Sequence, residues 1–222
     1  MVSRKYDAPR REEQAAATRT AIIEAAAQLF AERGYGATTM AAIASQARVA
    51  PKSVYGLGDK AQLLTMALDR AITGDMEPAP VAERPAFRAV LDASTGLDQA
   101  RLGAAFGASM LLRMYPLYRA FEQAAAMHPQ IHERWLAYQE RRREDVRRVV
   151  EAVEAVTPLR PGMDIDRATD TLWALIGWHP IALLVEQRKW TEAQIQSWIQ
   201  DIFVTIIAEP NAEPGDSSVG GA

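Results

Sequence analysis

The chain of 222 residues contains no cysteine and only three histidines. Without cysteine it can form no disulfide, thiolate metal site or cysteine nucleophile, and its composition fits a reducing cytoplasm. His128 and His132 lie four residues apart beside Glu133, a spacing that can bind a metal on a helix. Pro129 lies between them and no third ligand is evident, which favours a solvated helix end. We therefore expect no metal and no other cofactor.

The sequence also lacks recognisable catalytic motifs and long apolar runs. It has no glycine-rich phosphate loop, no Ser/His/Asp motif and no paired-carboxylate motif, so we expect no enzymatic activity. The longest apolar stretch, residues 172–185, is interrupted by His179 and Pro180 and is too short to span a bilayer. Residues 1–7 have no apolar core of the kind found in signal peptides. These absences predict a cytoplasmic protein that does not enter a membrane.

Charge is unevenly distributed along the chain. Residues 1–60 hold nine Lys and Arg against six Asp and Glu, a net charge of +3, whereas the remainder carries −6 of the overall −3. A cationic N-terminal part on an acidic body suits a protein that binds DNA through one end only.

Residues 38–64 read as two short helices joined by a tight turn, with a third helix starting just after. Thr39 can cap the first helix through its hydroxyl. Ile43 and Ala44 then face inward, and Val49 is the buried residue of the turn at 47–49. Ala50 precedes Pro51, which suits a first helical position because its missing N–H costs nothing there.

The second short helix of this pattern carries small, polar and basic residues at its start. Val54 faces the first helix, so Lys52, Ser53 and Tyr55 point outward. Gly56 and Gly58 end the helix, and the residue after them, Asp59, can cap a helix that begins at Lys60. A helix of this kind can enter the major groove of DNA.

The segment resembles the N-terminal domain of the TetR family of bacterial transcriptional regulators, over about residues 17–65. The matching residues are Leu29 to Gly36, Thr38, Thr39, Ile43, Ala44, Val49, Ser53, Val54, Tyr55, Asp59, Lys60, Leu63 and Leu64. The resemblance implies that Thr39, Tyr55 and Lys60 contact phosphates, and that Lys52 and Ser53 lie at base edges or the adjacent backbone. The predicted DNA-binding residues are Thr39, Arg48, Ala50, Pro51, Lys52, Ser53, Tyr55 and Lys60.

Two departures from the family pattern affect these expectations. Arg48 replaces the usual turn glycine, and since left-handed backbone costs a non-glycine residue about 1 kcal/mol, we expect an adjusted turn there. Arg48 also adds a cation near the DNA face. The interval from Tyr55 to Lys60 is one residue short, and Leu57 stands where an aromatic residue is usual. A three-helix scaffold without DNA binding is the structural alternative.

Periodicity and capping residues predict an all-α fold. The resemblance implies that an N-terminal three-helix helix-turn-helix domain is followed by a larger helical ligand-binding and dimerisation domain. The expected parts are a disordered basic arm at 1–14, the DNA-binding domain at 15–62, the larger domain at 63–208 and a disordered tail at 209–222. An arm that reaches DNA is the alternative at 1–14. The expected long helices are 15–33, 60–73, 82–93, 98–114, 117–127, 130–156, 165–187 and 192–208.

Prolines and charges refine this outline. Pro116 and Pro129 suit helix starts, and Pro180 should kink or break the helix at 165–187. The arginines at 141–143 and 147–148 alternate with acidic residues, which favours a solvated face over a second DNA-binding patch.

The last two long helices are apolar over most of their circumference and must be buried on two sides. The resemblance implies that they form a four-helix dimer interface; ordinary burial within one chain is the alternative. The predicted interface residues are Leu172, Ile176, Leu183, Leu184, Ile195, Trp198 and Ile202.

The central helices interleave flexible methionines and aromatic residues with small residues such as Gly103 and Gly107. This mixture suggests a cavity for an apolar or aromatic ligand, with Tyr138 and His179 as polar anchors, although each residue alone could be ordinary core. The predicted ligand-binding residues are Phe106, Met110, Met114, Trp135, Tyr138, Trp173 and His179.

Together these features predict a homodimeric, ligand-responsive transcriptional regulator, with a double-stranded DNA operator and a small-molecule effector as partners. Following the family's usual behaviour, the ligand would release a repressor from a palindromic operator by moving the helix at 60–73. One alternative is an apolar small-molecule binding protein with a degenerate DNA-binding head. Another is an all-α enzyme that uses His179 with a carboxylate.

Overall fold

A computed structural model describes residues 8–74 and 81–207 of the chain. Within these ranges the protein is built from helices and has no strand, only an isolated bridge between Leu159 and Ile207. The predicted all-α fold is confirmed. The elements are α1 (Ala8–Ala37), α2 (Met40–Ala47), α3 (Pro51–Leu57), α4 (Lys60–Thr73), the 3-10 helix η1 (Val81–Glu83), α5 (Pro85–Leu91), α6 (Gly96–Met127), α7 (Pro129–Val156), α8 (Ile165–Leu175), α9 (Trp178–Ala182), the π-helical turn η2 (Leu183–Gln187) and α10 (Glu192–Val204).

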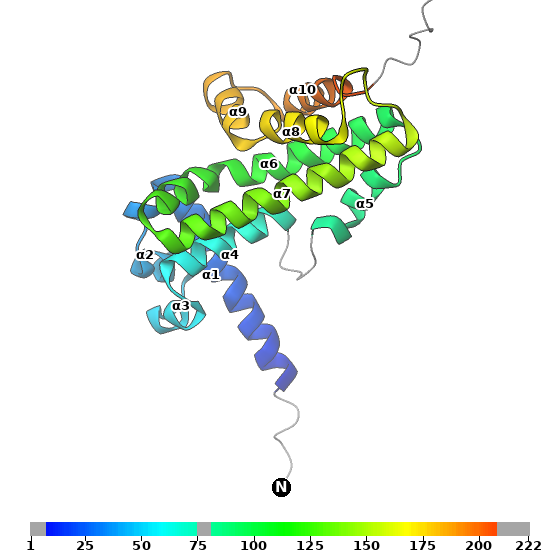
Figure 1. Cartoon of the computed structure of the whole chain (residues 1–222). Helices are drawn as coiled ribbons and strands as arrows, with labels where there is room; N and C mark the ends of the chain where they lie inside the picture. Colours follow the sequence, from blue (N-terminus) through cyan, green and yellow to red (C-terminus); the bar gives the residue numbers. More distant parts are fainter. Residues whose placement is uncertain (1–7, 75–80, 208–222) are drawn as a thin grey trace, which may run out of the picture.

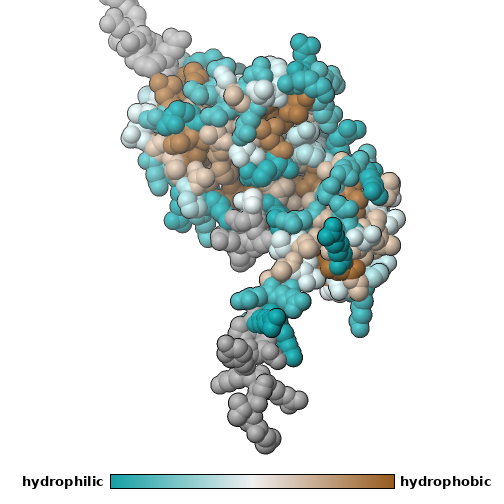
Figure 2. All heavy atoms as spheres, turned by 180° about the vertical axis from the view of Figure 1, so that it is seen from behind, coloured by the Kyte–Doolittle hydropathy of each residue, from teal (hydrophilic) through white to brown (hydrophobic). Residues whose placement is uncertain are grey.

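Helices α1 to α4 lie at one end of the molecule, and α5 to α10 form the larger body (Figure 1). The long helices α6 and α7 run side by side, and α8, α9 and α10 lie along one side of this pair. The first turns of α1 extend well beyond α3 (Figure 1). Hydrophilic side chains surround this projecting start, whereas the hydrophobic patches lie on the rest of the surface (Figure 2).

Local capping sets the bounds of the short N-terminal helices. Thr39 accepts a hydrogen bond from the N–H of Ala42 at 3.1 Å and so caps α2. Pro51 occupies the first turn of α3, where its missing N–H breaks no bond. At the start of α4, Asp59 and Gln62 each accept a bond from the other's backbone N–H at 2.8 Å, which is a capping box. The predicted starts of these three helices are confirmed.

The turn after α2 differs from the expectation. Arg48 adopts left-handed backbone, with φ 56° and ψ 42°, so the predicted adjusted turn is wrong. Two bonds explain why the strain is tolerated: the N–H of Arg48 donates to Ser45 O, and that of Val49 donates to Ala44 O at 3.0 Å. These bonds satisfy the last carbonyl groups of α2, as a left-handed glycine usually allows at the end of a helix.

Helix α1 begins earlier than expected. It includes residues 8–14, so their assignment to a disordered arm is wrong; residues 1–7 lie outside the described part. Glutamate, arginine, glutamine and alanine dominate this stretch and all favour helix, which explains the earlier start. Gly34, with φ 76°, breaks the helical geometry near the other end, where the sequence predicted the stop.

Proline positions account for two further corrections. Helix α6 is continuous, so the predicted break before Pro116 is wrong. Its neighbours Met114 and Leu117 are buried, and their packing holds both flanks in the helix. The expected helix at 165–187 does break, but at Ile176 and Gly177 rather than at Pro180. Pro180 lies in the first turn of α9, where a proline costs no hydrogen bond.

The same segment, Ile165–Gln187, is the one part of the described chain that is long and apolar enough to be compared with a membrane span. It is interrupted at Gly177, and buried residues on both sides of the break, Leu172 and Ile181, belong to the protein's core. Helices in a protein core can be equally long and apolar. The break at Gly177 and the buried residues on both sides of it favour a core helix here.

Two apolar cores run through the molecule. The first joins α1 to α4 with the second half of α6, the start of α7 and Trp178 of α9. The second joins α5, the first half of α6, the second half of α7, α8 and α10, with Ile181 of α9. The core of the N-terminal helices thus continues into α6 and does not end at residue 62, the predicted domain boundary.

Candidate functional site

The outer face of α2 and α3 presents the residues predicted to bind DNA. Val54 is fully buried and anchors α3, while Lys52, Ser53 and Tyr55 beside it are exposed. Tyr55 is 64% exposed, so most of its surface is open to solvent. The other exposed members of the predicted set are Thr39, Arg48, Ala50 and Pro51. Seven of the eight predicted residues are thus exposed to solvent.

Lys60 is the eighth residue, and its amine has other partners. Its Nζ donates to Tyr35 O at 2.9 Å and to Thr38 O at 3.2 Å, and it lies 4.2 Å from the centre of the Tyr35 ring. These contacts tie the first residue of α4 to the end of α1. The shortened interval from Tyr55, noted in the sequence, leads into this arrangement rather than into an exposed cation.

A groove of about 430 Å³ lies between α1 and α3. Its lining residues are Arg11, Gln14, Ala15, Thr18, Arg19, Ile22, Ser53, Gly56 and Leu57. Two of them are cations and none is a carboxylate. The sequence reasoning did not identify this groove, although the α1 members recur at intervals of three and four residues, the spacing of one helix face.

A larger cavity of about 840 Å³ lies between α4, α5, α6 and α7, with walls completed by α8 and α10. Three of the seven predicted ligand-binding residues, Phe106, Met110 and Tyr138, line it. Apolar residues from both cores, such as Leu68 and Val149, form most of the wall. The cavity is thus the space between the two cores, and its volume is in the range typical of small-molecule sites.

The other four predicted ligand-binding residues are not among those that line the cavity. Met114 is fully buried, and Trp135 lies in an aromatic cluster around Trp178, with the two rings tilted against each other and their centres 5.0 Å apart. Trp173 lies over the guanidinium of Arg142. His179 is exposed and pairs with Glu122 at 3.3 Å, so it lies at the surface and is no polar anchor of the cavity.

Helix α4 supplies one wall that the sequence reasoning missed. Its members Thr65, Leu68, Asp69 and Ile72 recur at the spacing of one helix face, which is the signal that could have found them. Across the cavity, Arg134 of α7 donates to the Thr65 hydroxyl at 3.2 Å. Burial raises the pKa of Asp69, and Arg141 and Arg134 oppose this rise.

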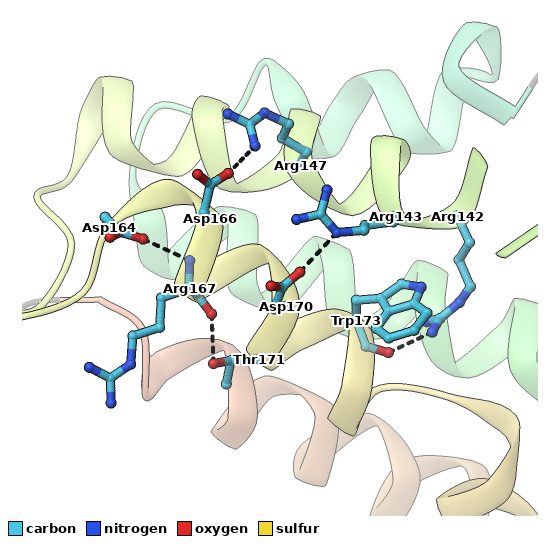
Figure 3. A network of polar contacts seen from close by, with 9 residues as sticks. All are labelled: Arg142, Arg143, Arg147, Asp164, Asp166, Arg167, Asp170, Thr171 and Trp173. Carbon is cyan, nitrogen blue, oxygen red and sulfur yellow. Dashed lines mark hydrogen bonds and ion pairs between the residues drawn. The ribbon is translucent and has the colours of Figure 1, made fainter. Parts of the chain in front are cut away.

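The arginines of α7 lie on the solvated face that the sequence predicts, with ion pairs at i, i+4 from Arg147 to Glu151 and at i, i+3 from Arg148 to Asp145, and several of them also contact α8. Arg143 binds Asp170 at 2.8 Å, and Arg147 pairs with Asp166 of α8 (Figure 3). Arg142 instead donates to the carbonyls of Trp173 and Ile176, at 2.5 and 2.8 Å. These contacts hold α8 against α7, a role that also argues against a second DNA-binding patch.

The predicted dimer residues divide into two groups. Leu172, Ile195 and Ile202 are buried in the chain's own core, as the alternative of ordinary burial predicted for them. Leu183 is 54% exposed, and the remaining members are partly exposed: Ile176, Leu184 and Trp198. Leu175 and Val204, which were not predicted, are also largely exposed large apolar residues.

Histidines form no metal centre in the part of the chain that the structure describes, where no group of three His, Asp or Glu side chains is suitably placed. His128 joins α6 to α7, and its ring lies 5.4 Å from that of Tyr35 in an edge-to-face contact.

One family model matches the N-terminal helices of the chain. The model of the bacterial regulatory proteins of the tetR family matches residues 22–64. No curated protein matches the chain.

Solved structures of similar fold extend over most of the chain. A protein from Saccharomonospora viridis described as a transcriptional regulator, in complex with choline, has a TM-score of 0.67 and 18% identity over 86% of this chain and 97% of its own. SmeT in complex with triclosan has a TM-score of 0.66 and 18% identity, over 88% of this chain and 93% of its own. MexZ, a repressor from Pseudomonas aeruginosa, has a TM-score of 0.52 and 22% identity, over 87% of this chain and 96% of its own. Residues 22–64 thus match the model of the bacterial regulatory proteins of the tetR family, and these solved structures share the fold of most of the chain.

Proposed function

We propose that the protein is a homodimeric repressor that binds a palindromic DNA operator in the cytoplasm and is released by a small ligand. The exposed run from Pro51 to Tyr55, fixed to the core by buried Val54, is the observation that carries this proposal. A helix with an apolar inner side and a small, polar and basic outer side is suited to the major groove.

The groove between α1 and α3 supports the same orientation on DNA. Arg11 and Arg19 line it opposite Ser53, and no carboxylate is among its lining residues. A phosphate backbone that passes beside α3 would meet donors of both helices there. Cations that meet phosphates release counterions and make binding dependent on salt.

Dimerisation would supply the second DNA reader. Leu175, Leu183 and Val204 are exposed apolar residues on α8, η2 and α10, where partner helices could cover them. A two-fold dimer would place two copies of α3 in successive major grooves, about 34 Å apart. Symmetry of this kind explains why the operator is expected to be a palindrome.

The cavity between the cores would hold the effector. Its α4 wall belongs to the helix that follows α3 after only two intervening residues, so a ligand that displaces α4 moves α3 as well. Release of DNA then requires only that the ligand prefers the displaced state. Small molecules in the structures from S. viridis and of SmeT, and the naming of MexZ as a repressor, support this proposal by analogy.

The test is selection of bound fragments from a random DNA pool, with wild type and the double variant Lys52→Ala/Tyr55→Phe in parallel. Wild type should enrich one palindrome, and the variant should lose it. Arg101→Ala, an exposed arginine at the start of α6, is the matched control and should behave as wild type. If wild type enriches no sequence at low salt, the repressor proposal fails, and a ligand-binding protein with an inactive head becomes the better description.

A further inference from the structure

The cavity between the two cores contains one deeply buried hydroxyl. Tyr138 is 8% exposed and lines the cavity. The one hydrogen-bond acceptor of its hydroxyl among the described residues is the Met114 thioether, at 3.6 Å. Sulfur is a weak acceptor, and a buried hydroxyl without a good partner is costly. Burial also raises the pKa of Tyr138, so that the hydroxyl keeps its proton and stays a donor.

The cavity also borders a cation without a carboxylate partner. The guanidinium of Arg142 bonds carbonyl oxygens of Trp173 and Ile176 and lies 5.1 and 5.3 Å from the rings of Trp173 and Trp178. No carboxylate of the described residues forms an ion pair with it, whereas its neighbours Arg143, Arg147 and Arg148 all have one. Burial consequently lowers the pKa of Arg142 to about 10.

The acidic residues of the cavity wall are already offset or solvated. Asp145 pairs with Arg148 at 2.9 Å. Asp69 faces the positive charges of Arg141 and Arg134, which act to lower its pKa. Glu144 is exposed to solvent. The cavity wall holds four arginines against three carboxylates, so its net charge is positive, and Arg142 is the one of these arginines that is not exposed to solvent.

We propose that the effector is an amphipathic acid: an apolar, ring-sized body that fills the cavity, and one anionic head group that accepts a hydrogen bond from Tyr138 and faces Arg142. This inference rests on the proposed function of the cavity and adds its ligand class. Ile176 both lines the cavity and gives its carbonyl to Arg142, so the head group lies next to the end of α8. A charged group that meets both a guanidinium and a hydroxyl donor forms hydrogen bonds stronger than those of neutral pairs.

Three probes that share one ring system separate the alternatives: pyrene-1-carboxylate, pyrene-1-carboxamide and pyrene-1-methylammonium. Their affinities for the full-length protein are measured by fluorescence titration and calorimetry without DNA. The carboxylate should bind at least tenfold more tightly than the amide or the ammonium. Equal affinities, tighter binding of the ammonium, or no binding of the carboxylate would overturn the proposal.

Variants assign the preference to residues. Arg142→Gln should abolish the preference for carboxylate over amide, whereas Arg143→Gln, which alters an arginine already paired with Asp170, should keep it. Tyr138→Phe removes a single oxygen and should weaken carboxylate binding several-fold. Tyr118→Phe is its control, because Tyr118 is also buried but is not among the residues that line the cavity.

The outcomes separate this inference from the proposed function. Arg142 also holds α8, so circular dichroism must show that Arg142→Gln folds; if it does not, the Tyr138 and Tyr118 pair decides. If the preference for carboxylate over amide survives in both Arg142→Gln and Tyr138→Phe, the proposal is contradicted. DNA selection that succeeds without an anion preference leaves the repressor and removes this ligand class. If DNA selection fails but the carboxylate probe is clearly preferred, the repressor proposal is removed and the ligand class stands.

Discussion

At the scale of single residues, Lys60 joins three elements through one amine. It begins α4, and it donates to carbonyl oxygens at the end of α1 and just before α2. Thr38, whose carbonyl it binds, is itself buried and donates to Gly34 O at 2.8 Å. The corner between α1 and α2 is thus stabilised from two sides. An amine held in this way braces the N-terminal helices, and we expect it to keep its carbonyl partners rather than meet a phosphate.

Replacing Lys60 should therefore affect stability more than DNA binding. We expect Lys60→Met to lower the free energy of unfolding by about 1–2 kcal/mol, because two charge-assisted hydrogen bonds at a half-buried site are lost. Urea denaturation measures this change. The slope of log affinity against log salt for DNA should stay that of wild type.

Lys52→Ala is the matched comparison for Lys60→Met. The Lys52 side chain is exposed on α3, so the free energy of unfolding should change by less than about 0.5 kcal/mol. The salt slope should fall by about 0.9, the contribution of one phosphate contact. A similar fall in Lys60→Met would show that Lys60 leaves its carbonyl partners to bind DNA, contrary to this expectation.

At the scale of elements, helix starts could be predicted and the partners of long side chains could not. Caps such as Thr39, Asp59 and Thr191 bind N–H groups three residues away, so sequence alone contains the whole interaction. Lys60 and Arg142 bind carbonyls that are 25 and 34 residues distant. Nothing local in the sequence indicates such pairs. The same reason explains why the α3 surface was found and most of the cavity wall was not.

Pro116 shows how packing can override a local rule. It lacks the N–H that would bond to Leu112 O, yet α6 continues through it because Met114 and Leu117 are buried on either side. The helix therefore retains a weak point that tertiary contacts hold in place.

Pro116→Ala should restore the missing hydrogen bond and stabilise α6. We expect the free energy of unfolding to rise by roughly 1–3 kcal/mol, measured by urea denaturation. Pro129→Ala serves as the control: Pro129 is in the first turn of α7, where no bond is missing, and stability should change by less than about 0.5 kcal/mol. If Pro116→Ala is neutral or destabilising, the backbone around Leu112 has adapted to the proline.

At the scale of the whole molecule, the proposed two-fold assembly makes a prediction about the exposed apolar residues. Leu183 is 54% exposed on η2, beside the partly exposed Leu184. A charge placed at the centre of an apolar interface would be buried without a partner. We expect Leu183→Glu to be monomeric by analytical ultracentrifugation and to lose cooperative binding to the palindrome.

Leu97→Glu and Leu136→Glu are matched controls, because these leucines are 52% and 55% exposed on other helices, α6 and α7. Both variants should remain dimeric. A dimer that persists in Leu183→Glu but dissociates in one of the controls would move the interface to that helix. Folding of each variant is checked by circular dichroism.

The two cores share α6, α7 and α9, and this arrangement limits what can be cut from the chain. Met114, Leu117 and Phe121 of α6 complete the apolar core of the first four helices. A fragment that ends with α4 would leave Leu63, Leu64 and their neighbours in water, without the surface that buries them. The DNA-reading part of this protein is therefore no portable module: transplanted into a fusion, it would have to take half of α6 with it.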